Sequence, residues 1–155
     1  MDLKILWPGK TRDPALRTLQ SEYLDKIARL GKCRVIETRE ARGVSEKDPG
    51  RILDIEAAGL EKHLQGEHLV CLTDRGDMMT SRQFAGFLEK TSLGQPYPIT
   101  FAVGGFLGLA DRLLKRAGTR MSLSKMTFSH ELTRIVLLEQ IYRALSILKG
   151  LHYAK

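Results

Sequence analysis

The sequence predicts a single-domain α/β protein, spanning residues 1–155, in which a parallel sheet is covered by helices. Three features favour this fold. Short apolar runs alternate with longer segments of helical periodicity along the whole chain. The first two apolar runs are each followed by an Asp-Pro pair, at Asp13 and Asp48, which is typical of a helix start. The run at residues 99–103 leads directly into Gly104 and Gly105. A strand followed by a helix is therefore expected five times in succession.

The amino-terminal half is expected to contribute two strand–helix units. Residues 3–7 form the first strand, which Pro8-Gly9 ends. A helix then begins at Asp13-Pro14, ends near Gly31, and has one apolar stripe, formed by Leu16, Leu19, Tyr23, Ile27 and Leu30. Residues 33–38 form the second strand. The second helix starts at Asp48-Pro49 and turns inward a less apolar face, formed by Ile52, Ile55, Glu56, Gly59, Leu60 and His63.

The loop at residues 39–47, between the second strand and the second helix, is polar and basic. Its Arg42 and Lys47 either contact an RNA backbone or are simply solvated.

The carboxyl-terminal half begins with a third strand at residues 68–73, which closes on Asp74-Arg75-Gly76. A helix capped by Thr80 or Ser81 runs to about residue 91, and residues 99–103 form the fourth strand. A short basic helix at residues 109–117, a brief strand at 120–123 and a loop at 124–130 follow. The last helix, residues 131–148, is apolar on more than one face, which predicts burial against its own sheet and against a second subunit.

Composition and charge narrow the class of protein. The chain is 43% hydrophobic and 28% charged, it has no apolar run long enough to span a membrane, and its start lacks the shape of a signal peptide. Its two cysteines, Cys33 and Cys71, lie within expected strands and have no metal-ligand spacing, so we interpret them as buried reduced thiols. These features predict a cytoplasmic protein.

The net charge of +7 is concentrated near the carboxyl end. Residues 1–110 contain 16 Lys/Arg and 15 Asp/Glu, whereas residues 111–155 contain 9 Lys/Arg and only 3 Asp/Glu. A basic region beside a ligand site indicates a polyanionic partner such as RNA or DNA. The alternative is a solvated basic surface.

The glycine turn after the fourth strand is the strongest candidate for a binding site. Glycine permits backbone angles that other residues avoid, and a strand–turn–helix junction is a common nucleotide site in α/β proteins. Such turns also occur only to reverse the chain. The sequence Gly104-Gly105-Phe106-Leu107-Gly108 matches neither the dinucleotide fingerprint nor a P-loop.

No arrangement typical of a nucleophilic or metal-dependent hydrolase is present. The four histidines, His63, His68, His130 and His152, do not have metal-ligand spacing, and no metal is expected. A reaction whose difficult step is carried by an organic cofactor fits better, because the protein then supplies binding and orientation.

An ordered set of motifs resembles one known family. The motifs are Leu72-Thr73-Asp74-Arg75-Gly76, then Val103-Gly104-Gly105, then residues 123–130 (LSKMTFSH), and finally Arg134 with residues 139–144 (EQIYRA). Their order and the chain length are similar to those of the bacterial ribosomal large subunit methyltransferase H family, a branch of the SPOUT (α/β-knot) methyltransferases. The resemblance covers the whole chain.

This resemblance implies an S-adenosyl-L-methionine-dependent enzyme that methylates N3 of a pseudouridine in 23S ribosomal RNA of the large subunit, within the subunit or the assembled ribosome. It also implies a homodimer and a deep trefoil knot near the carboxyl end, although threaded chains are rare. Three segments are expected to hold the cofactor, and their residues are Leu72, Gly104, Gly105, Leu123, Ser124, Lys125, Met126, Thr127 and Phe128.

The reaction implied is an in-line displacement at a sulfonium methyl group, which requires alignment of the two reactants and removal of the N3 proton. The candidate catalytic residues are His130, Arg134, Tyr142, Arg143, His152 and Tyr153, with Glu139 beside them. His130 either accepts a proton or serves as a helix cap or core hydrogen-bonding residue. Arg134 and Arg143 either hold phosphates or pair with Glu131 and Glu139 across a dimer.

The sequence departs from the family pattern at two places, and both leave the identity of the substrate undecided. The family's glycine turn continues with Pro-Glu-Gly, whereas Phe106-Leu107-Gly108 stands here, so an acid is missing from the turn. The family's tail ends in Pro-Tyr-His, whereas His152-Tyr153-Ala154 stands here. The alternative function is therefore a non-catalytic RNA- or ribosome-binding protein that retains the fold. A different nucleotide-using α/β enzyme is a weaker third option.

Overall fold

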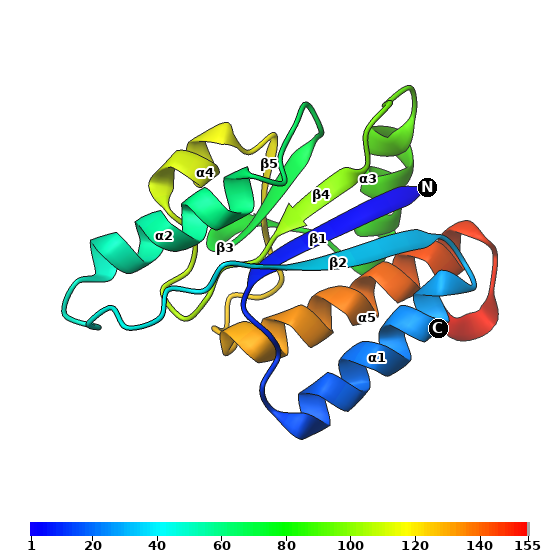
Figure 1. Cartoon of the computed structure of the whole chain (residues 1–155). Coiled ribbons are helices and arrows are strands. Elements are labelled where there is room, and N and C mark those ends of the chain that lie inside the picture. The colour runs from blue at the N-terminus through cyan, green and yellow to red at the C-terminus, as the bar shows by residue number, and fades with distance from the viewer. Residues whose placement is uncertain (155) are drawn as a thin grey trace.

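A five-stranded parallel sheet forms the centre of the molecule in the computed structural model, which describes residues 1–154 (Figure 1). The strand order is β2-β1-β4-β3-β5, and every neighbouring pair is parallel. The strands are β1 (Asp2–Pro8), β2 (Lys32–Thr38), β3 (Leu69–Met78), β4 (Ile99–Ala102) and β5 (Thr119–Ser122). The predicted α/β class, the parallel sheet and the alternating element order are confirmed.

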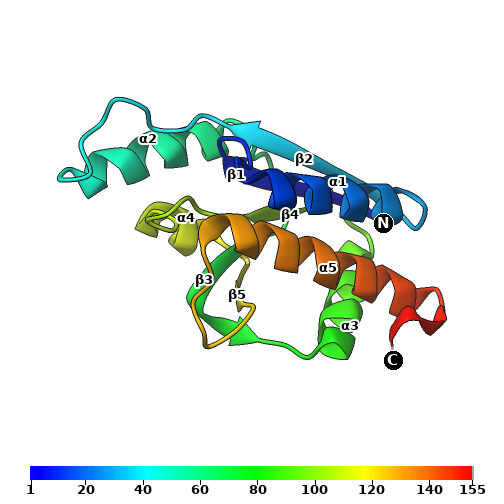
Figure 2. The same cartoon turned by 90° about the horizontal axis from the view of Figure 1, so that it is seen from below.

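Helices cover both faces of this sheet. They are α1 (Pro14–Ala28), α2 (Pro49–Glu61), α3 (Ser81–Ser92), α4 (Asp111–Arg116) and α5 (His130–Leu148), followed by a 3₁₀ turn, η1 (His152–Ala154). Figures 1 and 2 show α1, α3 and α5 on one face, and α2 and α4 on the other. The molecule therefore has three layers, as expected when helices connect parallel strands.

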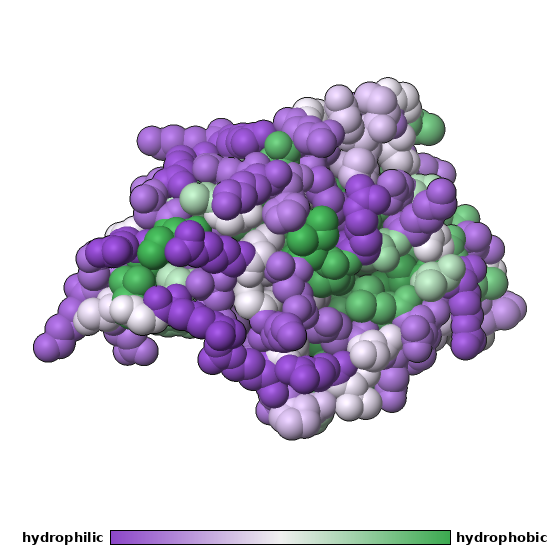
Figure 3. All heavy atoms as spheres, viewed as in Figure 1, coloured by the Kyte–Doolittle hydropathy of each residue, from purple (hydrophilic) through white to green (hydrophobic). Residues whose placement is uncertain are grey.

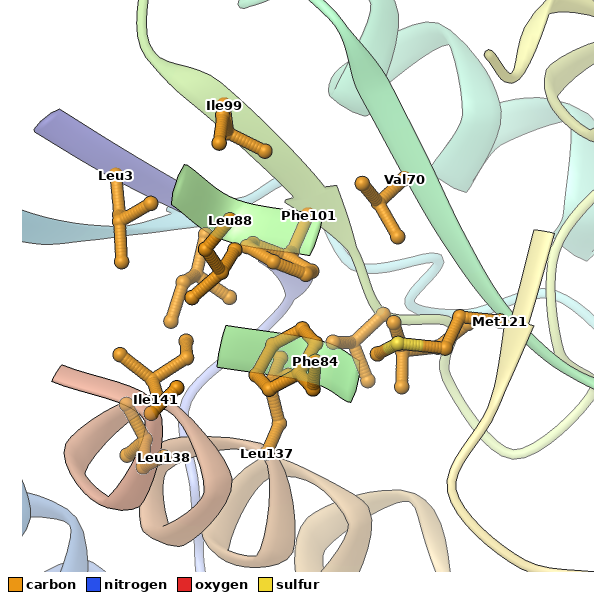
Figure 4. Packing of buried hydrophobic residues seen from close by; sticks show 14 of the residues in the cluster. Leu3, Val70, Phe84, Leu88, Ile99, Phe101, Met121, Leu137, Leu138 and Ile141 are labelled. Carbon is orange, nitrogen blue, oxygen red and sulfur yellow. The ribbon is translucent and has the colours of Figure 1, made fainter. Parts of the chain in front are cut away.

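Side chains of β1 point alternately to the two faces of the sheet and pack into two separate hydrophobic cores. Leu3, Ile5 and Trp7 pack into the larger core beneath α1, α3 and α5, whereas Leu6 packs on the opposite face with residues of α2 and α4. Figure 4 shows the larger core, where Phe84 of α3 meets Phe101 of β4 close to α5. Because both faces are covered, the central strands β1 and β4 and residues 69–72 of β3 are largely apolar and buried, which is why the sequence revealed them.

Helix α5 is flanked by α1 and α3 of its own chain (Figure 2). Its fully buried side chains include Leu137, Leu138 and Ile141, and Leu132 near its start is exposed. The two-sided burial predicted from its composition is thus provided by the sheet and two neighbouring helices. This burial alone does not require a second subunit.

Two local expectations are corrected by the structure. Leu19 belongs to the apolar stripe expected for the first helix, but its side chain is 38% exposed, and Ile27 is the residue of α1 that is fully buried. The third strand was expected to stop at residue 73, but β3 continues to Met78. Leu72 and Asp77 both pair with Met121 of β5, so the residues between them bulge out of the ladder.

The surface seen in Figure 3 is mostly polar, with an apolar strip over the region of β1 and β2. Strand β2 is an edge of the sheet within the described residues. A shallow groove between α1 and β2 includes the side chains of Leu24, Cys33 and Val35. Within residues 1–154, no helix combines the length and apolar character needed to cross a bilayer.

Candidate active site

A cavity of about 490 Å³ lies where β3, β4 and β5 end. Its walls are residues 72–75 after the regular part of β3, residues 103–109 after β4, and residues 121–124 and 126–128 at the end of β5. The start of α5 adds His130 and Thr133. Ligands of open parallel sheets bind at this carboxyl edge, so the cavity is a candidate active site.

The residues predicted to hold a cofactor converge on this cavity. Eight of the nine line it, and Lys125 does not: the lining ones are Leu72, Gly104, Gly105, Leu123, Ser124, Met126, Thr127 and Phe128. Segments separated by about 30 and 20 residues in the sequence meet here because β4 lies beside β3, and β3 lies beside β5. Their role in binding stays a prediction.

The glycine turn requires glycine for a geometric reason. A Cβ atom added to Gly104 would lie 2.4 Å from the backbone of Gly108, which is closer than any real contact. The Gly108 N–H donates to the Gly105 carbonyl at 3.0 Å, and Gly108 has a φ of 77°. The turn therefore folds back tightly on itself and presents backbone to the cavity.

The loop after β5 is held by its serines. The Ser122 hydroxyl donates to the Ser124 carbonyl at 2.8 Å, and the Met126 N–H donates to the Ser124 hydroxyl at 3.0 Å. Met126 itself is exposed at the cavity. The loop thus offers backbone groups and an apolar rim, which suits an uncharged heterocycle.

His130 lies at the cavity as the first residue of α5. It is not the helix cap, because the Ser129 hydroxyl accepts the Leu132 N–H. Burial, followed by the nearby charge of Arg134, lowers the pKa of His130 below its ordinary value. The imidazole is therefore neutral at pH 7 and is chemically able to accept a proton there.

Arg134 lies outside the cavity lining and is almost fully buried, with 1% of its surface exposed. It donates to the Pro8 carbonyl at 2.7 Å and to the Thr11 hydroxyl at 3.0 Å, and its guanidinium stacks 4.8 Å from the centre of the Trp7 ring. Burial lowers its pKa to about 10. In this chain the guanidinium joins α5 to the end of β1 and the residues that follow it.

The other candidate catalytic residues form a separate cluster at the carboxyl end of α5. Arg143 pairs with Glu139 at 2.7 Å, within the same helix, and the Tyr153 hydroxyl donates to Glu139 at 3.1 Å. The rings of Tyr142 and Tyr153 are 4.6 Å apart, and His152 is exposed in η1. With a rise of about 1.5 Å per residue, Tyr142 is roughly 18 Å along the helix from His130. One chain does not bring the two groups together.

Glu131, the other acid proposed to pair across a dimer, is also engaged within its own chain. Its carboxylate accepts the N–H groups of Arg12 at 2.7 Å and of Asp13 at 3.0 Å. Arg134, Arg143 and both acids therefore have partners within their own chain. No ion pair between subunits is needed to explain these charges.

Sequence reasoning did not select Glu56 as a functional residue. This residue of α2 is 5% exposed, and its Oε1 atom would lie 2.8 Å from a Cβ atom added to Gly105. Burial and the charge of Glu40 raise the pKa of Glu56 to about 7, against a lowering effect of Arg134. The signal in the sequence was an acid on the inward face of an amphipathic helix.

The described residues 1–154 contain no cluster of three or more His, Cys, Asp or Glu side chains placed to hold a metal ion. Cys33 and Cys71 are free thiols, and burial raises the pKa of Cys71 to about 11. Neither thiol is therefore a nucleophile at neutral pH.

Fold and cavity together define an α/β protein with a backbone-lined ligand site at the carboxyl edge of a parallel sheet. Comparison with known proteins identifies its family. The family described as "Predicted SPOUT methyltransferase" matches residues 1–154. The ribosomal RNA large subunit methyltransferase H of Geobacter metallireducens is 40% identical over 99% of this chain and 98% of that protein. The chain belongs to the SPOUT methyltransferases and, among them, to the ribosomal RNA large subunit methyltransferase H family.

One further relative agrees with this assignment, and one solved structure is similar in fold. The Clostridium botulinum (strain Langeland) protein of the same description is 36% identical over the full length of both chains. A Legionella pneumophila protein, solved in complex with the cofactor SAM, superposes with a TM-score of 0.50 at 16% identity, over 93% of this chain and 66% of that one. The second similarity supports the fold alone. The family predicted from the sequence motifs is confirmed.

Proposed function

We propose that this protein is an S-adenosyl-L-methionine-dependent methyltransferase that modifies N3 of a pseudouridine in 23S ribosomal RNA of the large subunit. The observation that carries the proposal is the convergence of three distant segments on one cavity, in a chain of this family. The names of the full-length relatives describe methyltransferases of large-subunit ribosomal RNA, and the Legionella neighbour was solved with the cofactor SAM.

The cavity suits this cofactor on structural grounds. Gly104 packs closely on the Gly108 backbone and Gly105 on Glu56, where no side chain would fit, so the turn lines the cavity with its backbone. In this proposal, backbone groups of residues 123–124 and 126–128 bind an adenine edge and a ribose, and Asp74 and Asp111 line the same cavity. The bound cofactor supplies an electrophilic methyl group on a sulfonium.

The protein contributes orientation and proton removal to the transfer. Neutral His130 borders the cavity and is the group best placed to receive the N3 proton. The Arg75 side chain, exposed at the rim, and the basic carboxyl-terminal third offer positive charge to the RNA backbone. Residues 1–155 form a single domain, and the protein acts in the cytoplasm. The target of the protein is ribosomal RNA in the large subunit or the assembled ribosome.

The active species is a homodimer whose chains are knotted near the carboxyl end. A second copy is favoured because the candidate catalytic residues fall into two groups roughly 18 Å apart along one helix. If a second copy of the chain placed its tail, with His152 and Tyr153, near this cavity, the candidate catalytic residues would lie together in one site. The apolar strip over β1 and β2 offers one surface for self-association (Figure 3).

Mixing two inactive variants tests this shared site. Gly104→Ala disables the cavity, and Tyr153→Phe removes the tail hydroxyl. If sites are shared, random reassociation of equal amounts should restore about a quarter of wild-type methyl transfer, since half of the dimers would hold one intact site. The control is each variant alone at the same total concentration. Absence of recovery, with subunit exchange shown by mass spectrometry, would contradict a shared site.

Isothermal titration with S-adenosyl-L-methionine tests the cofactor itself. We expect saturable binding with one site per chain. A folded protein that shows no heat of binding, at concentrations up to about 1 mM of ligand, would overturn the proposed function.

A further inference from the structure

An unpaired carboxyl group lies behind the glycine wall of the cavity. Glu56 is buried, and its Oε1 atom has no hydrogen-bond partner among residues 1–154. Gly105 separates this atom from the cavity, since Gly105 lines the cavity and its missing Cβ would lie 2.8 Å from Oε1. Glu56 does not line the cavity itself. Any effect on a ligand therefore acts across the turn.

The neighbouring charges compensate this carboxyl only in part, since Arg134 lowers its pKa from a distance without pairing with it. Arg134, which approaches from α5, donates its hydrogen bonds to the end of β1 and the residues that follow it. It makes no ion pair with Glu56 in the described part of the chain. Glu40, after β2, adds a second negative charge and pairs with Arg12 at 2.7 Å. No cation is thus committed to Glu56.

Such a group needs an explanation, because a buried carboxylate without a partner destabilises the folded state. Burial raises the pKa of Glu56 to about 7, so a substantial fraction is ionised under neutral conditions. A charge in a poorly solvated position acts over several ångströms, since little water screens it. A positive ligand group on the other side of the turn would relieve the penalty.

We propose that Glu56 makes the cavity favour a positively charged methyl donor over its neutral demethylated product. This inference rests on the proposed cofactor. The donor carries a sulfonium, whereas the product carries a neutral thioether at the same place. The carboxylate would therefore strengthen binding of the donor selectively and leave the affinity for the spent product unchanged. Glu56 is a positioning residue in this account, because it acts through the glycine turn.

A charge series of ligands tests the proposal on the Glu56→Gln variant, which keeps the shape of the side chain. The probes are S-adenosylmethionine, sinefungin, which has an ammonium in place of the sulfonium, and S-adenosylhomocysteine, which is neutral there. We expect the dissociation constants of the two cationic ligands to rise about tenfold and that of the neutral one to stay within about twofold. Unchanged affinities, or equal weakening of all three, would overturn the proposal.

Two controls separate the charge effect from a structural one. Glu89→Gln removes one negative charge from an exposed position on α3 and should leave all three affinities unchanged. The wild-type preference for the cationic ligands should increase between about pH 6 and 8, as Glu56 ionises, relative to Glu56→Gln measured at each pH. No binding of any ligand to the wild type would instead contradict the proposed function.

Glu56→Gln should bind the cationic ligands more weakly without any loss of thermal stability. A carboxyl whose pKa is raised on folding binds more protons in the folded state, so its contribution to stability falls as pH rises toward the raised pKa. Glu56→Gln should therefore unfold at the same or a higher temperature than the wild type at pH 8. A marked loss of thermal stability would indicate a structural role and would count against the proposal.

Discussion

Replacing Gly104 with alanine is expected to weaken cofactor binding by at least two orders of magnitude. The added Cβ would lie 2.4 Å from the carbonyl carbon and oxygen of Gly108, so the turn must open by about an ångström. Displacements of this size in a preorganised site typically cost on the order of 100-fold. Isothermal titration of S-adenosyl-L-methionine, together with circular dichroism to verify folding, measures the effect.

The matched control is Gly86→Ala. Gly86 lies on the exposed side of α3, and a Cβ atom there meets no atom within 4 Å. Because alanine favours a helix over glycine by roughly 0.5–1 kcal/mol, this variant should be slightly more stable and bind the cofactor normally. Near-normal binding by Gly104→Ala would show that the turn does not form the cofactor wall.

Replacing Lys4 with methionine is expected to lower the free energy of unfolding by about 3–5 kcal/mol while leaving cofactor affinity unchanged. Lys4 forms a buried ion pair with Glu67, whose side chain is 2% exposed, and also donates to the His63 carbonyl at 2.6 Å. The Thr100 hydroxyl donates to Glu67 at 3.1 Å. This network lies at the amino edge of the sheet, opposite the cavity. The substitution should therefore lower the free energy of unfolding without changing the affinity for the cofactor. Urea denaturation measures the loss.

A double variant provides the control for this prediction. Lys4→Met with Glu67→Leu removes both charges, so most of the lost stability should return. A double variant as unstable as the single one would show that packing, rather than an uncompensated carboxylate, is responsible.

The same ion pair predicts how stability depends on pH. Burial alone would raise the pKa of Glu67, but the hydrogen bonds from Lys4 and the backbone outweigh it, and the net pKa is lowered. A carboxyl with a lowered folded-state pKa stabilises the protein above its unfolded pKa of about 4.3 and loses that contribution as pH falls through the folded value. The wild type should thus lose stability in acid more steeply than the double variant.

Much of the fold followed from local signals. Asp13 and Asp48 cap α1 and α2 as expected, because an acid before proline satisfies free N–H groups whatever the tertiary context. The apolar strands were recognisable since both faces of the sheet are covered. The extension of β3 past residue 73 could not be recognised from the sequence. It depends on Met121 of β5, which pairs with two residues of β3.

The candidate site was predictable only in part. The three segments that the family resemblance implied for the cofactor do line one cavity, and their role in binding stays a prediction. The position of Arg134 was missed, since a buried arginine that binds Pro8 and Thr11 looks the same in sequence as one that binds a phosphate. Glu56 was missed because its importance comes from a contact with Gly105, 49 positions away, that only the folded chain creates.

The central claim is that this protein transfers a methyl group to ribosomal RNA, and one assay tests it most directly. Purified protein is incubated with methyl-labelled S-adenosyl-L-methionine and ribosomes from a strain that lacks pseudouridine-N3 methylation, and the RNA is digested for mass spectrometry. We predict one labelled methyl group per ribosome, at N3 of a pseudouridine in 23S RNA, with none from Gly104→Ala. Cofactor binding and ribosome binding without any labelled nucleotide would contradict the claim and would indicate the non-catalytic RNA-binding alternative.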